Sequence, residues 1–191
     1  MDKTVVFAAS LGKASVVAFN GSGKLIATMR TGVGTLATDP RGNLYVAPNQ
    51  EYDVDKLKIF ASPYTGSPKV IHIPGQIVRG IAVDQRTGVF AVLSDSSRPG
   101  GGPSRITFFM SGATTACNIV HQPRNLTNFF SGAAFDREGV LFLIAGSAAG
   151  HPLASTAGEC KAKTVQVYPF RNTQDYLAFN ADDNLVLQGY S

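Results

Sequence analysis

Three aspartates recur in similar local sequences and are the first candidates for chemistry. Asp39, Asp84 and Asp136 are spaced by 45 and 52 residues, and each stands between an apolar stretch and a turn that contains Gly. Repeated carboxylates could bind a cation. An Asp that begins a tight turn, however, accepts hydrogen bonds from the backbone N–H groups that follow it. We therefore expect these side chains to stabilise turns and not to bind a metal.

A second group of carboxylates alternates within one segment. Glu51, Asp53 and Asp55 could lie on one side of an extended chain, but the segment lacks the Gly and the distal Glu of a calcium-binding EF-hand loop. The chain also has no Gly-x-Ser-x-Gly elbow, phosphate-binding loop or Cys-x-x-Cys pair. The sequence thus assigns no catalytic residue, metal ligand or cofactor, and it favours a non-catalytic protein over an enzyme.

One cation stands out at a repeated position. Gly34, Arg79 and Ser131 each precede a repeated Asp by five residues, and Arg79 is the only charged residue of the three. A guanidinium there would suit an anionic ligand or an acidic loop of a partner, and the alternative is a structural ion pair. The residues that we expect to contribute to ligand binding are Arg79, Ser131, Asp53, Asp55, Arg98 and His151.

The histidines divide by their expected positions. His72 and His121 fall on predicted outermost strands, where we expect packing or surface roles. His151 lies in the long segment 147–162, which we interpret as a loop and from which it could act as an acid, a base or a ligand. Arg98 lies in another long loop, beside three consecutive glycines at 100–102.

The elements that position these residues are repeated hairpins. Residues 36–47, 81–92 and 133–144 each read as a strand, a polar turn with Gly, and a second strand. Repeats of 45 to 52 residues built from short strands are typical of β-propeller blades. We predict an all-β chain, residues 1–191 forming a single β-propeller domain of four-stranded antiparallel blades, about four in this chain.

The predicted strands run from the channel outward as a, b, c and d in each blade. The first blade has b, c and d at 5–10, 15–20 and 24–30. The second has all four at 34–39, 43–48, 56–62 and 69–74, and the third has all four at 79–84, 89–94, 105–111 and 117–122. The fourth has a, b and c at 131–136, 140–146 and 163–170.

The tail allows two alignments. Residues 178–185 match the turn around Asp39 and equally the turn at 18–25. We favour 174–180 as strand d of the fourth blade and 184–190 as strand a of a further blade. That strand could close a four-blade ring against the N-terminal strands. The alternatives are part of a larger, six-bladed ring and closure through a second chain as a homodimer.

Two segments resemble NHL-repeat and SMP-30/lactonase-like propellers. They are the strand–turn–strand sequence at Gly80–Val92 and the sequence KIFASPYTGSPKVIHIPG at Lys58–Gly75. The resemblance covers residues 5 to about 170 and points to the superfamily, not to one member. It implies a usually six-bladed fold that serves as a scaffold for a protein or small-molecule ligand. It also leaves an alternative, a calcium- or zinc-dependent lactonase-like hydrolase or a streptogramin-lyase-like enzyme. No channel position supplies the Glu of the lactonase metal set, and the lyase His/Glu pair is not matched.

Composition narrows the partners and the compartment. The net charge of +4 comes from scattered basic residues, so we expect no nucleic-acid partner. No apolar run is long enough to span a membrane, and residues 1–30 do not read as a signal peptide. The chain would then be cytoplasmic, or a truncated exported protein. Under the predicted strand order Cys117 and Cys160 lie near opposite ends of a strand, so we expect no disulfide between them.

Overall fold

The computed structural model describes residues 4–10, 14–32, 34–48, 54–96, 103–124, 126, 128–146, 152–168, 176–179, 183 and 185–188. In this part of the chain the regular elements are strands and one short 3₁₀ helix. None of the described helical structure is long and apolar enough to cross a membrane.

The strands form blades of antiparallel neighbours, as predicted. Blade 1 contains β1 (Val5–Ser10), β2 (Ser15–Asn20) and β3 (Leu25–Arg30). Blade 2 contains β4 (Gly34–Thr38), β5 (Leu44–Pro48), β6 (Lys56–Phe60) and β7 (Lys69–His72). Blade 3 contains β8 (Gln76–Val83), β9 (Phe90–Ser96), β10 (Arg105–Phe109) and β11 (Ala116–His121). Blade 4 contains β12 (Asn128–Phe135), β13 (Leu141–Gly146), β14 (Leu153–Thr156) and β15 (Gln166–Val167).

The repeated aspartates hold the first turns of blades 2, 3 and 4, which confirms their structural role. Asp39 Oδ1 accepts hydrogen bonds from the backbone N–H groups of Arg41 (3.0 Å) and Asn43 (2.8 Å). Asp136 Oδ1 accepts the equivalent bonds from Glu138 (2.9 Å) and Val140 (2.8 Å). The bonds satisfy donors that would otherwise be unpaired in the turn, so each turn fixes the register of the two innermost strands.

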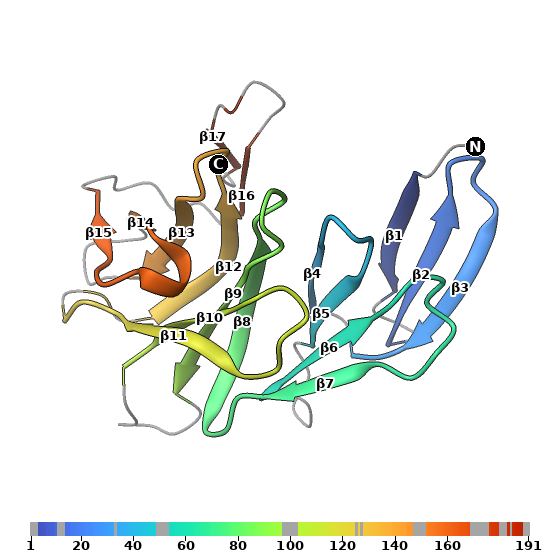
Figure 1. The fold of residues 1–191 in the computed structure, drawn as a ribbon, viewed down its shortest axis with the longest axis horizontal. Helices are drawn as coiled ribbons and strands as arrows, with labels where there is room; N and C mark the ends of the chain where they lie inside the picture. Colours follow the sequence, from blue (N-terminus) through green and yellow to red (C-terminus); the bar gives the residue numbers. More distant parts are fainter. Residues whose placement is uncertain are drawn as a thin grey trace.

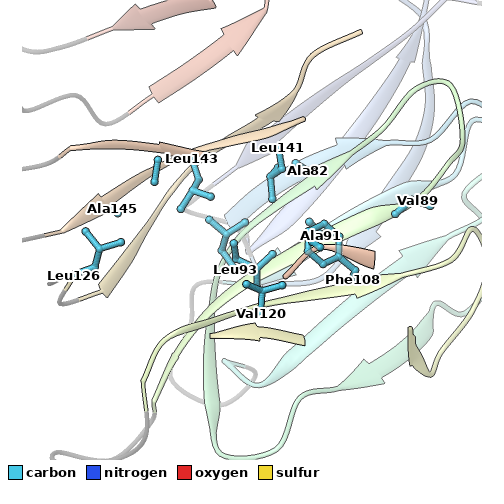
Figure 2. Packing of buried hydrophobic residues seen from close by; sticks show 13 residues of the cluster. Ala82, Val89, Ala91, Leu93, Phe108, Val120, Leu126, Leu141, Leu143 and Ala145 are labelled. Carbon is cyan, nitrogen blue, oxygen red and sulfur yellow. The ribbon is translucent and has the colours of Figure 1, made fainter. Parts of the chain in front are cut away.

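The core lies between the blades rather than inside any one of them. Each pair of neighbouring blades shares one cluster of buried apolar side chains. Between blades 3 and 4, Leu93 and Phe108 pack with Leu141 and Leu143, all fully buried (Figure 2). Both faces of a blade are therefore apolar, which explains the continuous burial along β5, from Leu44 to Pro48.

The prediction for the outer half of blade 4 was wrong. Strand c is β14, at Leu153–Thr156, within the segment that we interpreted as a loop. Strand d is the two-residue β15, which lies within 163–170, the range that we predicted for strand c. The four residues of β14 are all buried, so they show no polar alternation, and the small residues Ala and Ser in them resemble the flanking loop.

The favoured alignment of the tail was also wrong. β16 (Tyr176–Phe179) pairs with β17 (Leu185–Gln188) in a sheet of their own, so the two strands are a hairpin like β4–β5. Asp183 has φ 62° and takes the place of Gly42, whose φ is 79° in the equivalent turn. The tail thus begins a fifth blade with its strands a and b.

The four-blade ring closed by the tail is contradicted by this arrangement. Among the described residues the sheet of blade 1 contains β1, β2 and β3 alone, and β17 pairs with β16. Figure 1 shows the blades following one another along an arc, with blade 1 at one end and the hairpin β16–β17 at the other.

The structure contains a disulfide that the sequence did not lead us to expect. Cys117 in β11 is bonded to Cys160 in the 3₁₀ helix η2 (Glu159–Lys161), with 5.3 Å between the Cα atoms. The error follows from the misplaced strand. Because β14 precedes Cys160, η2 lies between strands c and d of blade 4, at the same end of the fold as the start of β11.

Candidate functional site

Arg79 lies on β8, the innermost strand of blade 3, at an irregularity in the pairing. Val78 pairs with Ser94 and Gly80 pairs with Leu93, so Arg79 is an extra residue with no partner across the ladder. Such a β-bulge redirects a side chain out of the regular alternation. A larger irregularity occurs in β12, where Phe129 pairs with Ala145 and Ala133 pairs with Leu143, and this stretch includes Ser131.

A buried carboxylate orients the Arg79 guanidinium. Nε of Arg79 donates to Oδ2 of Asp95 over 2.8 Å, and Ser104 Oγ donates to Oδ1 of the same residue over 2.6 Å. Asp95 is buried, whereas the Arg79 side chain is 41% exposed. Within the described ranges, Nη1 and Nη2 of Arg79 make no hydrogen bond. The ion pair therefore fixes one edge of the guanidinium and leaves its other donors open to solvent.

Blade 2 packs against β8 beside this arginine. Thr35 Oγ1 on β4 donates to the backbone carbonyl of Arg79 (3.3 Å). The backbone carbonyl of Val54, which precedes β6, accepts from the N–H of Val78 (2.7 Å). One further polar pair is buried nearby on the same strands, where Ser94 Oγ donates to Oε1 of Gln76 (3.1 Å). Blade 2 thus holds the backbone that carries Arg79 through two hydrogen bonds.

The remaining candidate residues are placed only in part. Asp55 directly precedes β6, and its Oδ2 lies 3.9 Å from Nδ1 of His72 on β7, with both side chains exposed. Asp53, Arg98 and His151 lie outside the described residues. His121 is exposed on β11, in agreement with its predicted surface role.

A second candidate site lies at the other end of β8 and was missed at the level of sequence. It is a surface pocket of about 410 Å³ between blades 3 and 4, formed by both of their first turns and by the segment around η2. Its lining combines charged and apolar groups: Arg86, Thr87, Val89, Met110, Glu138, Gly139, Gly158, Glu159, Cys160 and Lys161.

Two carboxyl groups meet at this pocket. Thr87 Oγ1 lies 3.0 Å from Oε1 of Glu159 and 3.1 Å from Oδ2 of Asp84. Burial and the neighbouring Asp84 raise the pKa of Glu159. Burial acts the same way on Asp84, but hydrogen bonds from Arg86 and Glu159 outweigh it and lower the Asp84 pKa. When the pair holds a single proton, that proton therefore resides on Glu159 and Asp84 is ionised.

Arg86 neutralises the ionised partner. Its Nη2 and Nε lie 3.0 Å and 3.3 Å from the two carboxylate oxygens of Asp84, and this contact raises the pKa of the guanidinium. Asp84 is thus both a turn residue and part of a charged cluster. A sequence signal for this was present, because Asp84 is the only repeated Asp that is followed two residues later by an Arg and three residues later by a Thr.

Neither site brings together a set of metal ligands. In the parts of the chain that the structure describes, no three His, Cys, Asp or Glu side chains are close enough to hold an ion together. The described side chains at the two sites, which lie near opposite ends of β8, form hydrogen bonds and ion pairs.

Comparison with known proteins gives matches of structure only. No protein-family model and no curated protein sequence matches the chain. Many solved structures are similar, and three of them match 96% of this chain. A protein of unknown function from Bacteroides caccae has a TM-score of 0.68 at 11% identity, and virginiamycin B lyase from Staphylococcus aureus has 0.67 at 11%. A chain of the nidogen/laminin complex has 0.65 at 14% identity.

The match is unequal in length. The chain spans 64%, 59% and 68% of these three proteins respectively. At such low identity the likeness shows the fold and nothing finer. Together with the four-stranded antiparallel blades, it establishes that this chain has the β-propeller fold.

Proposed function

We propose that this chain is a non-catalytic propeller scaffold that binds an anionic group of a protein or small-molecule partner at the end of the channel where Arg79 lies. The observation that carries the proposal is the state of the Arg79 guanidinium. One edge is held by buried Asp95, and Nη1 and Nη2 have no partner among the described residues. A guanidinium fixed in this way can bind a carboxylate through two parallel hydrogen bonds at little entropic cost.

The surroundings support binding rather than bond cleavage. Asp95 is committed to Arg79 and Ser104, so it is not placed to act as a base on a ligand. The chain of similar fold in the nidogen/laminin complex belongs to an assembly of two proteins. A partner with an acidic loop or a ligand with a carboxylate is the chemistry that this site fits.

The test is binding of a fluorescein-labelled hexaglutamate peptide, measured by anisotropy. We expect saturable binding, a loss of about tenfold or more for Arg79→Gln, and partial retention for Arg79→Lys, which keeps the charge but not the fork. Arg124→Gln is the matched control, because Arg124 is exposed and follows β11 in the connection to blade 4. Equal losses for Arg79→Gln and Arg124→Gln would show that binding follows net charge and would refute the assignment to Arg79.

The alternative, a calcium- or zinc-dependent hydrolase or a lyase in the channel, makes a different prediction. A resident metal stabilises the folded chain in proportion to its occupancy, so melting temperature would rise with the concentration of the ion and saturate. A scaffold that uses Arg79 predicts a melting temperature unchanged by calcium, zinc or manganese. A saturable rise with one of these ions would favour the hydrolase.

The compartment forms part of the same proposal. A disulfide that links neighbouring blades is typical of proteins that fold in an oxidising environment, since cytosolic thiols are kept reduced. We therefore assign the chain to an exported protein, the second of the two compartments that the sequence left open. Alkylation of the protein under non-reducing conditions tests this, because an exported protein would yield no modified Cys117 or Cys160.

A further inference from the structure

One wall of the second pocket is attached to blade 3 by the disulfide bond. Residues 157–162, which we name the strap, connect β14 to the stretch before β15 and contain η2. The strap supplies Gly158, Glu159, Cys160 and Lys161 to the pocket lining. The other walls belong to the turns of blades 3 and 4 and to Met110. Whatever holds the strap therefore determines the shape of this pocket.

Few non-covalent contacts hold the strap against blade 3. The helix η2 has no buried residue. Asn118 Nδ2 donates to the carbonyl oxygens of Ala162 (2.7 Å) and Glu159 (3.3 Å), and Thr87 contacts the Glu159 carboxyl group. Ala162 is buried at the end of the strap. Both Gly158 and Glu159 have positive φ values of 92° and 45°, and for Glu159 this backbone conformation is unfavourable.

One contact works against attachment. Attachment of the strap partly buries Glu159, which is the larger cause of its raised pKa, and brings it close to Asp84, so the contact is unfavourable when both carboxyl groups are ionised. The charged groups around Glu159 are Asp84 and Arg86 from the first turn of blade 3, Glu138 from that of blade 4, and Lys161 within the strap. From β11 the facing group is the neutral Asn118 amide. Arg86 is already paired with Asp84, so ionised Glu159 meets a net unfavourable field.

The disulfide offsets this repulsion and is itself accessible. Cys117 is exposed on β11, the outermost strand of blade 3, and Cys160 is half-buried. We propose that the Cys117–Cys160 bond is a thiol-sensitive clasp, and that its reduction by a dithiol releases the strap from blade 3 and opens the pocket. This inference concerns the opposite end of β8 from Arg79 and does not depend on the proposed function.

The exchange balances in two steps. A thiolate of the reductant attacks Sγ of Cys117, the more exposed of the two cysteines, the S–S bond breaks, and Cys160 leaves as a thiolate. The second thiolate of the reductant then attacks the mixed disulfide and releases Cys117, while the reductant becomes a cyclic disulfide. Two electrons pass from the dithiol to the protein, and both cysteine thiolates take up protons. The strap is then held by the hydrogen bonds of Asn118 and Thr87, by buried Ala162, and by the packing of Cys160 against Met110 and the core between blades 3 and 4.

Limited proteolysis with trypsin tests the clasp, because Lys161 lies within the strap. In the oxidised protein the N–H of Ala162 donates to the carbonyl of Glu159 (3.0 Å) and Ala162 is buried, so the bond after Lys161 is protected. We expect cleavage after Lys161 to be at least about tenfold faster once a dithiol has reduced the disulfide, since cleavage follows the open population. Lys24, in an exposed turn of blade 1, is the matched control site.

Each outcome decides the matter. Selective acceleration at Lys161, reproduced without reductant in Cys117→Ser/Cys160→Ser, supports the clasp. An unchanged rate at Lys161 would show that the strap stays attached without the bond. Equal acceleration at Lys24 and Lys161 would show that reduction unfolds the whole chain, and two alkylatable thiols in the purified protein would show that the bond is absent. Any of these three results refutes the clasp.

A further variant separates the clasp from a simple crosslink. Glu159→Gln keeps the hydrogen-bonding shape and removes the charge, so we expect the reduced variant to retain more of the protection at Lys161 than the reduced wild type. A reduced Glu159→Gln protein that is cleaved as fast as the reduced wild type would overturn the role assigned to this carboxylate.

Discussion

Gly139 and Arg86 come from neighbouring blades, and the missing side chain of Gly139 provides the space in which the Arg86 guanidinium lies. A Cβ atom at position 139 would overlap with Nη2 of Arg86. The same guanidinium pairs with Asp84, so the glycine of one turn determines where the charge of the other turn can lie. The backbone of Gly139 has φ 84°, which favours glycine on its own account.

These two effects can be separated by substitution. We expect Gly139→Ala to lower the free energy of unfolding by more than Gly75→Ala does. Gly75 has a similar φ of 72°, and no atom lies within 4 Å of the place that a Cβ would take, so its substitution costs the backbone term alone, about 1–2 kcal/mol. Urea unfolding of both variants measures the difference. Equal losses would mean that Arg86 moves aside without cost.

The carboxyl pair gives the pH dependence of stability a definite sign. The raised pKa of Glu159 means that the folded state binds more protons than the unfolded state above about pH 4.3, so stability falls as pH rises through that window. Asp84 has the opposite sign, since its lowered pKa contributes stability that is lost only as pH falls through the lowered value. Glu159→Gln should remove the first effect and keep the second.

Urea midpoints measured between about pH 4 and about pH 8 check this. We expect Glu159→Gln to be more stable than the wild type at the upper end and to converge with it at the lower end. A constant difference between the two proteins across the whole range would contradict the raised pKa of Glu159.

Because the blades repeat, the exposure of equivalent side chains can be compared from one blade to the next. In blades 1, 2 and 3 an equivalent cross-strand pair includes a Phe, namely Val6–Phe19, Leu44–Phe60 and Phe90–Phe109. The residues of the second and third pairs are at most 4% exposed, because the preceding blade covers them, whereas Val6 is 54% exposed and Phe19 half-buried. Blade 1 therefore presents a face with the chemistry of a blade-to-blade contact.

Alanine variants of Phe60 and Phe19 test whether the exposed face of blade 1 is covered in solution. Phe60→Ala should cost about 3–5 kcal/mol in unfolding free energy, the usual loss for a buried Phe, and Phe19→Ala clearly less. Thermal or urea unfolding of the two variants side by side is the measurement. Comparable losses would show that the face of blade 1 is covered in solution, by a second copy or by another part of a longer polypeptide.

The sequence predicted the inner half of each blade and missed much of the outer half of blade 4, for physical reasons. The turns at Asp39, Asp84 and Asp136 combine a capping side chain with a Gly, and both signals are local. β14 is buried on both faces and therefore has no alternation to read. Placing that stretch in a loop moved Cys160 to the wrong end of blade 4, which is why its bond to Cys117 was not expected.

The candidate site was predicted in the same uneven way. Arg79 was found because it is a lone charge at a repeated position, but its bulge and its bond to Asp95 depend on pairing between strands that are not local in sequence. The spacing of Asp84, Arg86 and Thr87 could be read from the sequence, but Glu159 lies 72 residues after Thr87, in the next blade, and no spacing rule could place it beside them. Tertiary packing, not local pattern, brings these groups together.

Arg79 as the anchor for an anionic partner is the central claim, and one NMR titration tests it directly. The Nε–Hε signals of ¹⁵N-arginine protein would be followed while hexaglutamate peptide is added, with Arg79→Lys used to assign the Arg79 signal. We predict that the Arg79 signal shifts saturably and more than any other arginine signal. Uniform small shifts across all arginines, with Arg79 no different from Arg124, would contradict the proposal that this end of the channel is the binding site.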